Sequence, residues 1–138
     1  MFWGVTLIIN AEFVVDRNNV MEQNMASKKT KPLASRRCKG CEGISGPLDE
    51  KSILRLLKDV PEWGVEDGRL VRNFEFLNFH QTIEFVNVLA WLCNLENHHP
   101  DLMVSYSTCK VQFITHAVSG LTENDFITAA KIDAILKC

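Results

Sequence analysis

The feature that most constrains the fold is a long run without helix breakers: from Phe79 to His99 the chain contains neither glycine nor proline. Apolar residues recur along this run at steps of three and four positions, which is the pattern of a helix with one buried face. They are Phe79, Ile83, Val86, Leu89 or Ala90, and Cys93. The run predicts a long central helix that ends before Pro100, because proline disfavours helical geometry in the residue before it.

A hairpin is predicted on each side of this helix. Before it, Asp67-Gly68 is a strong turn signal, and apolar and polar residues alternate from Leu70 to Phe76. After it, residues 102–106 alternate, a polar turn is expected at 107–109, and residues 111–115 alternate again. Alternation with a period of two is typical of strands with one buried face. The two segments therefore predict four antiparallel strands.

Two further helices complete the expected fold. The segment from Asp49 to Val60 carries an apolar stripe and stops at Pro61. Thr122 and Asp125 resemble a capping box in front of the apolar positions that continue to Ile135. The order α-β-β-α-β-β-α predicts an α+β fold, in which three helices cover one face of a four-stranded antiparallel sheet.

The length and composition favour one domain. With 138 residues, of which 46% are apolar, the chain can bury one core but not two. We expect residues 48–138 to form this domain and residues 1–24 to contribute nothing to its core. Residues 1–47 are expected to be a flexible extension that contains a basic stretch and the CxxC pair Cys38 and Cys41.

Charge and cysteine content limit the possible partners. The net charge of −2 is uneven, because the basic stretch from Lys28 to Lys39 contains no acid and the rest of the chain is acidic. An acidic body is a poor surface for nucleic acid. The apolar opening, residues 1–9, is too short to span a bilayer. Five cysteines, an odd number, do not form the pattern of a disulfide-stapled module, so we expect a cytoplasmic protein without nucleic-acid or membrane partners.

Three of the four histidines fall where the expected fold could bring them together. His98 lies at the end of the central helix, and His99 leaves it before Pro100. If the second hairpin turns near Thr108, antiparallel pairing places His116 opposite Pro100. A group of imidazoles near neutral pH indicates proton transfer or metal binding.

Metal binding is the weaker of these two alternatives. Adjacent side chains such as those of His98 and His99 diverge at a helix end, and no HExxH pattern fixes two histidines on one face. Cys38 and Cys41 supply only half of a structural zinc site. The residues therefore favour no metal site, although metal binding stays open as the alternative to proton transfer at this point.

The spacing of these residues resembles a known family. Asn97-His98-His99-Pro100 is followed by Tyr106 six residues beyond the proline, His116 ten further on and Asp125 nine beyond that. Over residues 48–137 this pattern is similar to that of the pterin-4a-carbinolamine dehydratases. The resemblance implies dehydration of 4a-hydroxytetrahydropterin, left by an aromatic amino acid hydroxylase, to quinonoid dihydropterin. The pterin is then the substrate, and the resemblance implies that the reaction needs no metal and no bound cofactor.

The resemblance also implies roles for individual residues. His98 and His116 are the expected acid and base, in either order, and His99 is the expected pterin contact that shares in proton transfer. Asp125 closes the family pattern and also occupies a capping position, while Tyr106 packs at the hairpin and lines the pocket. Asn94 stands where the family usually carries a charged residue such as glutamate, so we expect it to orient a histidine or the substrate.

The family further implies homodimers or homotetramers, with dimers that pair sheet edges. A different class of function is the main alternative. Animal relatives act as dimerisation partners of a transcription factor, and the helical surface from Phe126 to Ile135 is the expected contact for such a role.

Overall fold

The computed structural model describes residues 31–40 and 43–137, which belong to one compact unit. The expectations for residues 1–24 and for Cys41 lie outside the described residues. No helix in the described ranges is long and apolar enough to cross a bilayer.

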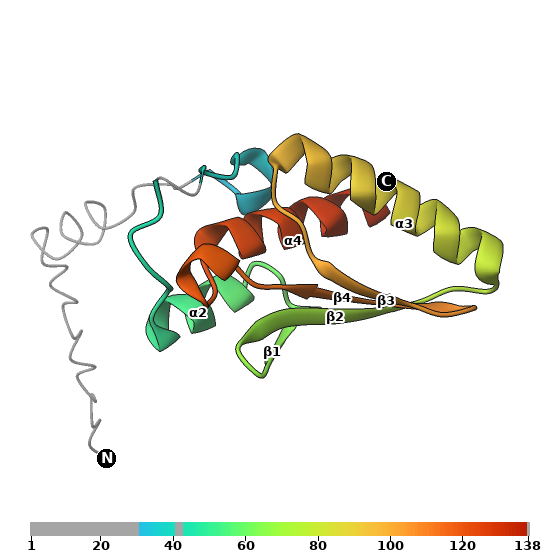
Figure 1. Ribbon diagram of the computed structural model, residues 1–138, viewed down its shortest axis with the longest axis horizontal. Coiled ribbons are helices and arrows are strands. Elements are labelled where there is room, and N and C mark those ends of the chain that lie inside the picture. Colours follow the sequence, from blue (N-terminus) through green and yellow to red (C-terminus); the bar gives the residue numbers. More distant parts are fainter. Residues whose placement is uncertain (1–30, 41–42, 138) are drawn as a thin grey trace, which may run out of the picture. The chain divides into compact units, whose positions relative to one another are not determined.

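The elements follow the expected order (Figure 1). A four-stranded antiparallel sheet has the strand order β1-β2-β4-β3, and α3 and α4 lie on the same side of it. The predicted α+β fold is therefore confirmed. The bounds are η1 Leu33–Ser35, α2 Glu50–Leu57, β1 Gly64–Glu66, β2 Arg69–Glu75, α3 Phe79–Glu96, β3 Asp101–Val104, β4 Thr108–Phe113, η3 His116–Val118 and α4 Glu123–Leu136.

The core lies between the sheet and the helices. Alternate residues of β4 face it, namely Cys109, Val111 and Phe113, and all three are completely buried. Their partners across the ladder on β2 are Phe74, Arg72 and Leu70. Because side chains alternate across a strand, the other residues of β4 lie on the opposite face of the sheet.

The first hairpin forms as predicted. Gly64 to Glu66 pair with Val71 to Arg69, and the two turn residues Asp67 and Gly68 have φ values of 47° and 74°. Both values lie in the left-handed region, which Asp and Gly tolerate best.

The second hairpin turns earlier than expected. The turn occupies residues 105–107, and Cys109 belongs to the strand. A hydrogen bond from Ser105 N to Thr108 O closes the turn, while Thr82 Oγ1 of α3 donates to Tyr106 O. A free cysteine behaves as a small apolar side chain, which explains why Cys109 enters the core.

The earlier turn changes the register, so the predicted pairing of His116 with Pro100 was wrong. Asp101 pairs with Gln112, and β4 ends at Phe113. Thr115 forms an isolated bridge with Gly120, and His116 begins η3 in the loop that this bridge closes.

The compact unit begins at Lys31, before the expected domain boundary at residue 48. Leu33 is only 3% exposed and belongs to the hydrophobic core, and η1 packs on α4. We call residues 31–40 the N-terminal strap. The apolar contact of Leu33 and the polar contacts described below hold the strap on the helices, although its composition is polar and basic.

Candidate active site

The end of α3 sets the position of His98. Asn97 adopts a left-handed conformation, with φ 50° and ψ 40°, and its N–H bonds back to the carbonyls of Asn94 and Cys93. His98 N then donates to Cys93 O at 3.1 Å. Asparagine is one of the few residues other than glycine that adopt this conformation readily. The turn directs the chain out of the helix at the histidine pair.

His98 is bound by a buried carboxylate. Its Nε2 lies 2.7 Å from Asp125 Oδ1, and the Asp125 side chain is completely buried while that of His98 is 11% exposed. The imidazole also stacks on Phe113, with ring centroids 5.6 Å apart and an interplanar angle of 10°. Because a carboxylate accepts, Nε2 carries the proton, and Nδ1 is the nitrogen left for other chemistry.

The second oxygen of Asp125 organises the surrounding loop. Oδ2 accepts from Thr122 N at 2.7 Å, a bond of the predicted capping box at the start of α4, and also from Thr115 Oγ1 at 2.9 Å. Thr115 Oγ1 also contacts Thr122 Oγ1 at 2.8 Å. Asp125 therefore caps α4 and holds His98 at the same time.

His116 directly follows Thr115 and is exposed at the start of η3. No hydrogen bond or ion pair of the described residues involves its ring. Asp125 thus links His98 to Thr115, the residue just before His116. The predicted strand pairing does not form, and the connection between the two segments runs through this buried carboxylate instead.

His99 and Asn94 form a separate exposed pair. His99 Nε2 lies 3.1 Å from Asn94 Oδ1. An amide oxygen accepts, so Asn94 orients His99 with its Nε2 proton toward α3.

Tyr106 is not brought to the histidines. It is 69% exposed and stacks on Phe79, the first residue of α3, whereas His98 follows the last turn of the same helix. An 18-residue helix spans about 27 Å, so Tyr106 packs at the far end of the hairpin.

The strap closes one side of a polar cavity of about 270 Å³. Residues 37–40 line it from the strap, Glu96, Asn97 and His98 from the end of α3, and Thr115 and Asn124 from the opposite side. Sequence reasoning missed Thr115, Asn97 and the strap. An asparagine just after a periodic run is a known helix-stop signal, so Asn97 could have been identified, whereas the other contacts join segments distant in sequence.

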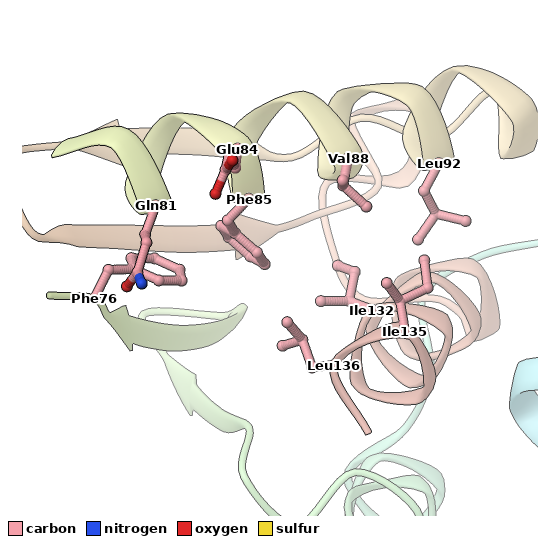
Figure 2. A pocket seen from close by; sticks show the side chains of 9 residues that line it. All are labelled: Phe76, Gln81, Glu84, Phe85, Val88, Leu92, Ile132, Ile135 and Leu136. Carbon is pink, nitrogen blue, oxygen red and sulfur yellow. The ribbon is translucent and has the colours of Figure 1, made fainter. Parts of the chain in front are cut away.

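A larger cavity of about 350 Å³ lies between α3 and α4 (Figure 2). Val88 and Leu92 from α3 face Ile132, Ile135 and Leu136 from α4, and the lining is mainly apolar. None of the expected catalytic residues lines it. It offers few groups for proton transfer, so the polar cavity at His98 is the better candidate active site.

The titratable groups beside the polar cavity have shifted pKa values. Burial raises the pKa of the Cys38 thiol to about 11 and that of the Cys93 thiol to about 12. Burial also opposes ionisation of Glu96, but hydrogen bonds from Lys131 and from Cys38 N outweigh it and lower the pKa of this carboxyl. The thiols are therefore protonated at neutral pH and are poor nucleophiles.

Among the described residues, no three side chains of His, Cys, Asp or Glu are grouped so that they could share a metal ion. His98 Nε2 is engaged by Asp125, and His99 Nε2 by Asn94.

Comparisons with known proteins identify the family. Residues 46–135 match the model of the family described as pterin 4 alpha carbinolamine dehydratase. A relative from Legionella pneumophila (strain Corby) is 52% identical over 110 residues, which cover 78% of this chain and 97% of the relative. A relative from Nitrosomonas eutropha is 50% identical over 105 residues, covering 75% of this chain and 93% of the relative. Both carry provisional names as pterin-4-alpha-carbinolamine dehydratases.

A solved structure supports the same assignment. The crystal structure of a transcriptional coactivator/pterin dehydratase from Brucella melitensis is similar with a TM-score of 0.62 and 28% identity, covering 65% of this chain and 98% of that one. The resemblance first suggested by the histidine pattern is therefore confirmed, and this chain belongs to the pterin-4α-carbinolamine dehydratase family.

Proposed function

We propose that the chain dehydrates 4a-hydroxytetrahydropterin to quinonoid dihydropterin by histidine acid-base catalysis. The observation that carries this proposal is the buried Asp125 carboxylate, which binds His98 with one oxygen and Thr115, the neighbour of His116, with the other. Family membership supports the substrate class.

The reaction needs two proton transfers. The bond between C4a and its hydroxyl oxygen breaks, the departing oxygen takes up a proton and leaves as water, and the adjacent ring nitrogen loses its proton. A positioned acid or base typically contributes a factor of about 10² to 10⁴ to such steps.

The environments of the two histidines favour a division of these roles. Asp125 holds the Nε2 proton of His98, so Nδ1 is the free acceptor and the carboxylate stabilises the imidazolium that forms when Nδ1 takes a proton. This arrangement suits a general base. The side chain of His116 is exposed, and its ring makes no hydrogen bond or ion pair with the described residues, so we propose it as the general acid. His99, oriented by Asn94, is the proposed pterin contact.

The product is an oxidised pterin that needs reduction before reuse, so we propose that the reaction serves the recycling of the pterin cofactor of an aromatic amino acid hydroxylase. Cys38, Cys93 and Cys109 are free thiols, which fits a reducing compartment such as the cytoplasm.

The sheet has β1 and β3 at its edges, and such edges can pair with a second copy, so we propose a homodimer or homotetramer.

The proposal is tested by the rate of carbinolamine dehydration in the wild type, His98→Ala and His116→Ala. We expect each variant to lose a factor of about 10² or more. His80→Ala is a matched control, because His80 is an exposed histidine at the start of α3 whose ring pairs, within the described part of the chain, with Glu84 alone. Equal rates in all four proteins would reject histidine catalysis.

The alternative function is protein interaction without catalysis. The surface expected for it was wrong in part, because Phe126, Ile127 and Ile132 of α4 are buried in the core of the same chain. A different surface fits better: Val88, Trp91 and Leu95 are exposed at helical spacing on α3. The Brucella melitensis protein is described as a coactivator as well as a dehydratase, which also favours this alternative.

Trp91→Glu separates the two functions. If the α3 surface mediates association, this variant should sediment as a smaller species than the wild type, whatever pairing the sheet edges make, while it keeps the wild-type dehydration rate. Unchanged association would remove this surface from consideration.

A further inference from the structure

The N-terminal strap precedes the segment matched by the family model, which begins at residue 46, yet it lines the cavity that contains His98. We propose that the strap is one wall of the substrate site and that Arg37 is a pterin-binding residue. This inference rests on the proposed function, since it names the same substrate class.

The strap is fixed to both helices that carry the site. Cys38 N donates to Glu96 Oε2 at 3.0 Å, and Glu96 lies two residues before His98 in the chain. Lys39 N donates to Asn124 Oδ1 at 2.9 Å, and Asn124 Nδ2 donates to Lys39 O at 2.8 Å. Asn124 is the residue before Asp125. The strap backbone is therefore held by the residues that flank the His98–Asp125 pair.

The buried carboxylate of Glu96 depends on the strap for one of its two partners. Its side chain is only 7% exposed, with Oε1 paired to Lys131 and Oε2 bound to Cys38 N. A buried carboxylate is costly unless its oxygens have partners. If the strap detached, Oε2 would lose its partner, and the contact of Cys38 Sγ with Thr128 Oγ1 would also be lost.

The charges of the strap are not equivalent. Arg36 pairs with Glu123, and Lys39 Nζ lies 3.9 Å from the same carboxylate. Arg37 lines the cavity and has no hydrogen bond or ion pair among the residues that the structure describes. Arg37 is thus an exposed arginine of the strap whose guanidinium is uncommitted and which lines the same cavity as His98.

The chemistry of a pterin fits this donor. The ring carries a carbonyl oxygen and adjacent ring nitrogens that accept hydrogen bonds, and a guanidinium presents several N–H groups in one plane. A cavity of about 270 Å³ is near the lower limit for small-molecule sites and suits one bicyclic ring. A pterin in contact with His98 would then lie between this histidine and the strap.

The experiment uses the full chain and two readouts. The first is the Kd of biopterin, a stable pterin that cannot be dehydrated, and the second is KM for the carbinolamine. Arg37→Ala should raise both by about tenfold, the effect of losing a hydrogen bond from a charged donor. Arg55→Ala, which removes an exposed arginine of α2 outside this cavity, should leave both values unchanged.

The outcomes separate this inference from the proposed function. An unchanged Kd in Arg37→Ala would overturn the role of the strap and leave the dehydratase proposal intact. Weakened biopterin binding in Arg37→Ala, with no turnover by the wild type, would support the strap site and overturn the dehydratase activity. Failure of the wild type to bind biopterin would overturn the inference.

Discussion

Replacement of Asp125 by asparagine tests the link between packing and chemistry most directly. The side chain keeps its shape but now offers one acceptor oxygen and one NH₂ donor. At Oδ2 the native carboxylate accepts from Thr122 N and Thr115 Oγ1, and at Oδ1 it accepts from His98 Nε2. The amide cannot satisfy all three donors as they stand.

The two possible amide orientations differ in cost. If the NH₂ group faces Thr122 N, two donors meet in a buried site, and the cap of α4 is lost. If it faces His98, the oxygen keeps both threonine bonds, and His98 only has to move its proton from Nε2 to Nδ1. The second orientation avoids two opposed donors and leaves only the second N–H of the amide without a partner, so we expect it to prevail.

The stability loss follows from the bonds that become neutral. Hydrogen bonds to a charged group are roughly twice as strong as neutral ones, so weakening the bonds at Asp125 costs about 2 kcal/mol in total. For a domain of this size that lowers Tm by roughly 10 °C. Urea or thermal unfolding followed by circular dichroism measures both quantities.

The activity loss has a separate cause. With its proton on Nδ1, His98 presents a donor where the mechanism needs an acceptor, and we expect kcat to fall by about 10² to 10⁴. Asp133→Asn is the matched control, because Asp133 is a buried carboxylate of the same helix that binds Trp63 Nε1 and Arg72 away from His98. A kcat of Asp125→Asn within threefold of the wild type, or an equal loss in Asp133→Asn, would refute the reasoning.

Two further predictions concern the strap. Burial opposes the charge of Glu96, but the hydrogen bonds from Lys131 and Cys38 N outweigh it and lower the pKa of this carboxyl. The ionised Glu96 therefore stabilises the fold at pH values above the unfolded pKa of about 4.3. This stabilisation is lost as the pH falls through the lower pKa of the native state. Glu96→Gln should therefore reduce the difference between the urea midpoints at pH 6 and pH 3; an unchanged difference would show that Glu96 is not responsible. Burial raises the pKa values of Cys38 and Cys93 to about 11 and about 12, so iodoacetamide at pH 8 should modify both slowly in the native chain and rapidly in urea. Peptide mapping by mass spectrometry distinguishes the sites, and rapid native modification of Cys38 would contradict the burial of its thiol against Thr128 of α4.

The fold was predictable where its signals are local. The helix run after Phe79 and the Asp67-Gly68 turn each specify their structure within a few residues. The second hairpin was misplaced because the sequence around Cys109 fits both a polar turn and a buried strand. A bond from Thr82 of α3 to Tyr106 O helps to fix the turn, and such a contact between distant segments leaves no periodic pattern.

In the candidate site, too, contacts between residues close in sequence were predictable and contacts between distant segments were not. Thr122 and Asp125 lie three residues apart, so their capping box could be read directly. The bond from His98 to Asp125 spans 27 positions and depends on the left-handed turn at Asn97. The strap was interpreted as a solvated tail because its composition is basic and polar. Its attachment uses Leu33 and backbone groups, which composition does not reveal.

The contact of Asn94 with His99 agrees with the expectation that this amide orients a histidine or the substrate. Asn94 contacts His99, whereas His98 is held by Asp125 on the other side of the helix end. The amide keeps the Nε2 proton of His99 in place without competing for the buried carboxylate. The absence of a charged residue at position 94 therefore leaves the proposed base intact. Its consequence falls on His99, the proposed pterin contact, and so on substrate binding and selectivity rather than on proton transfer at His98.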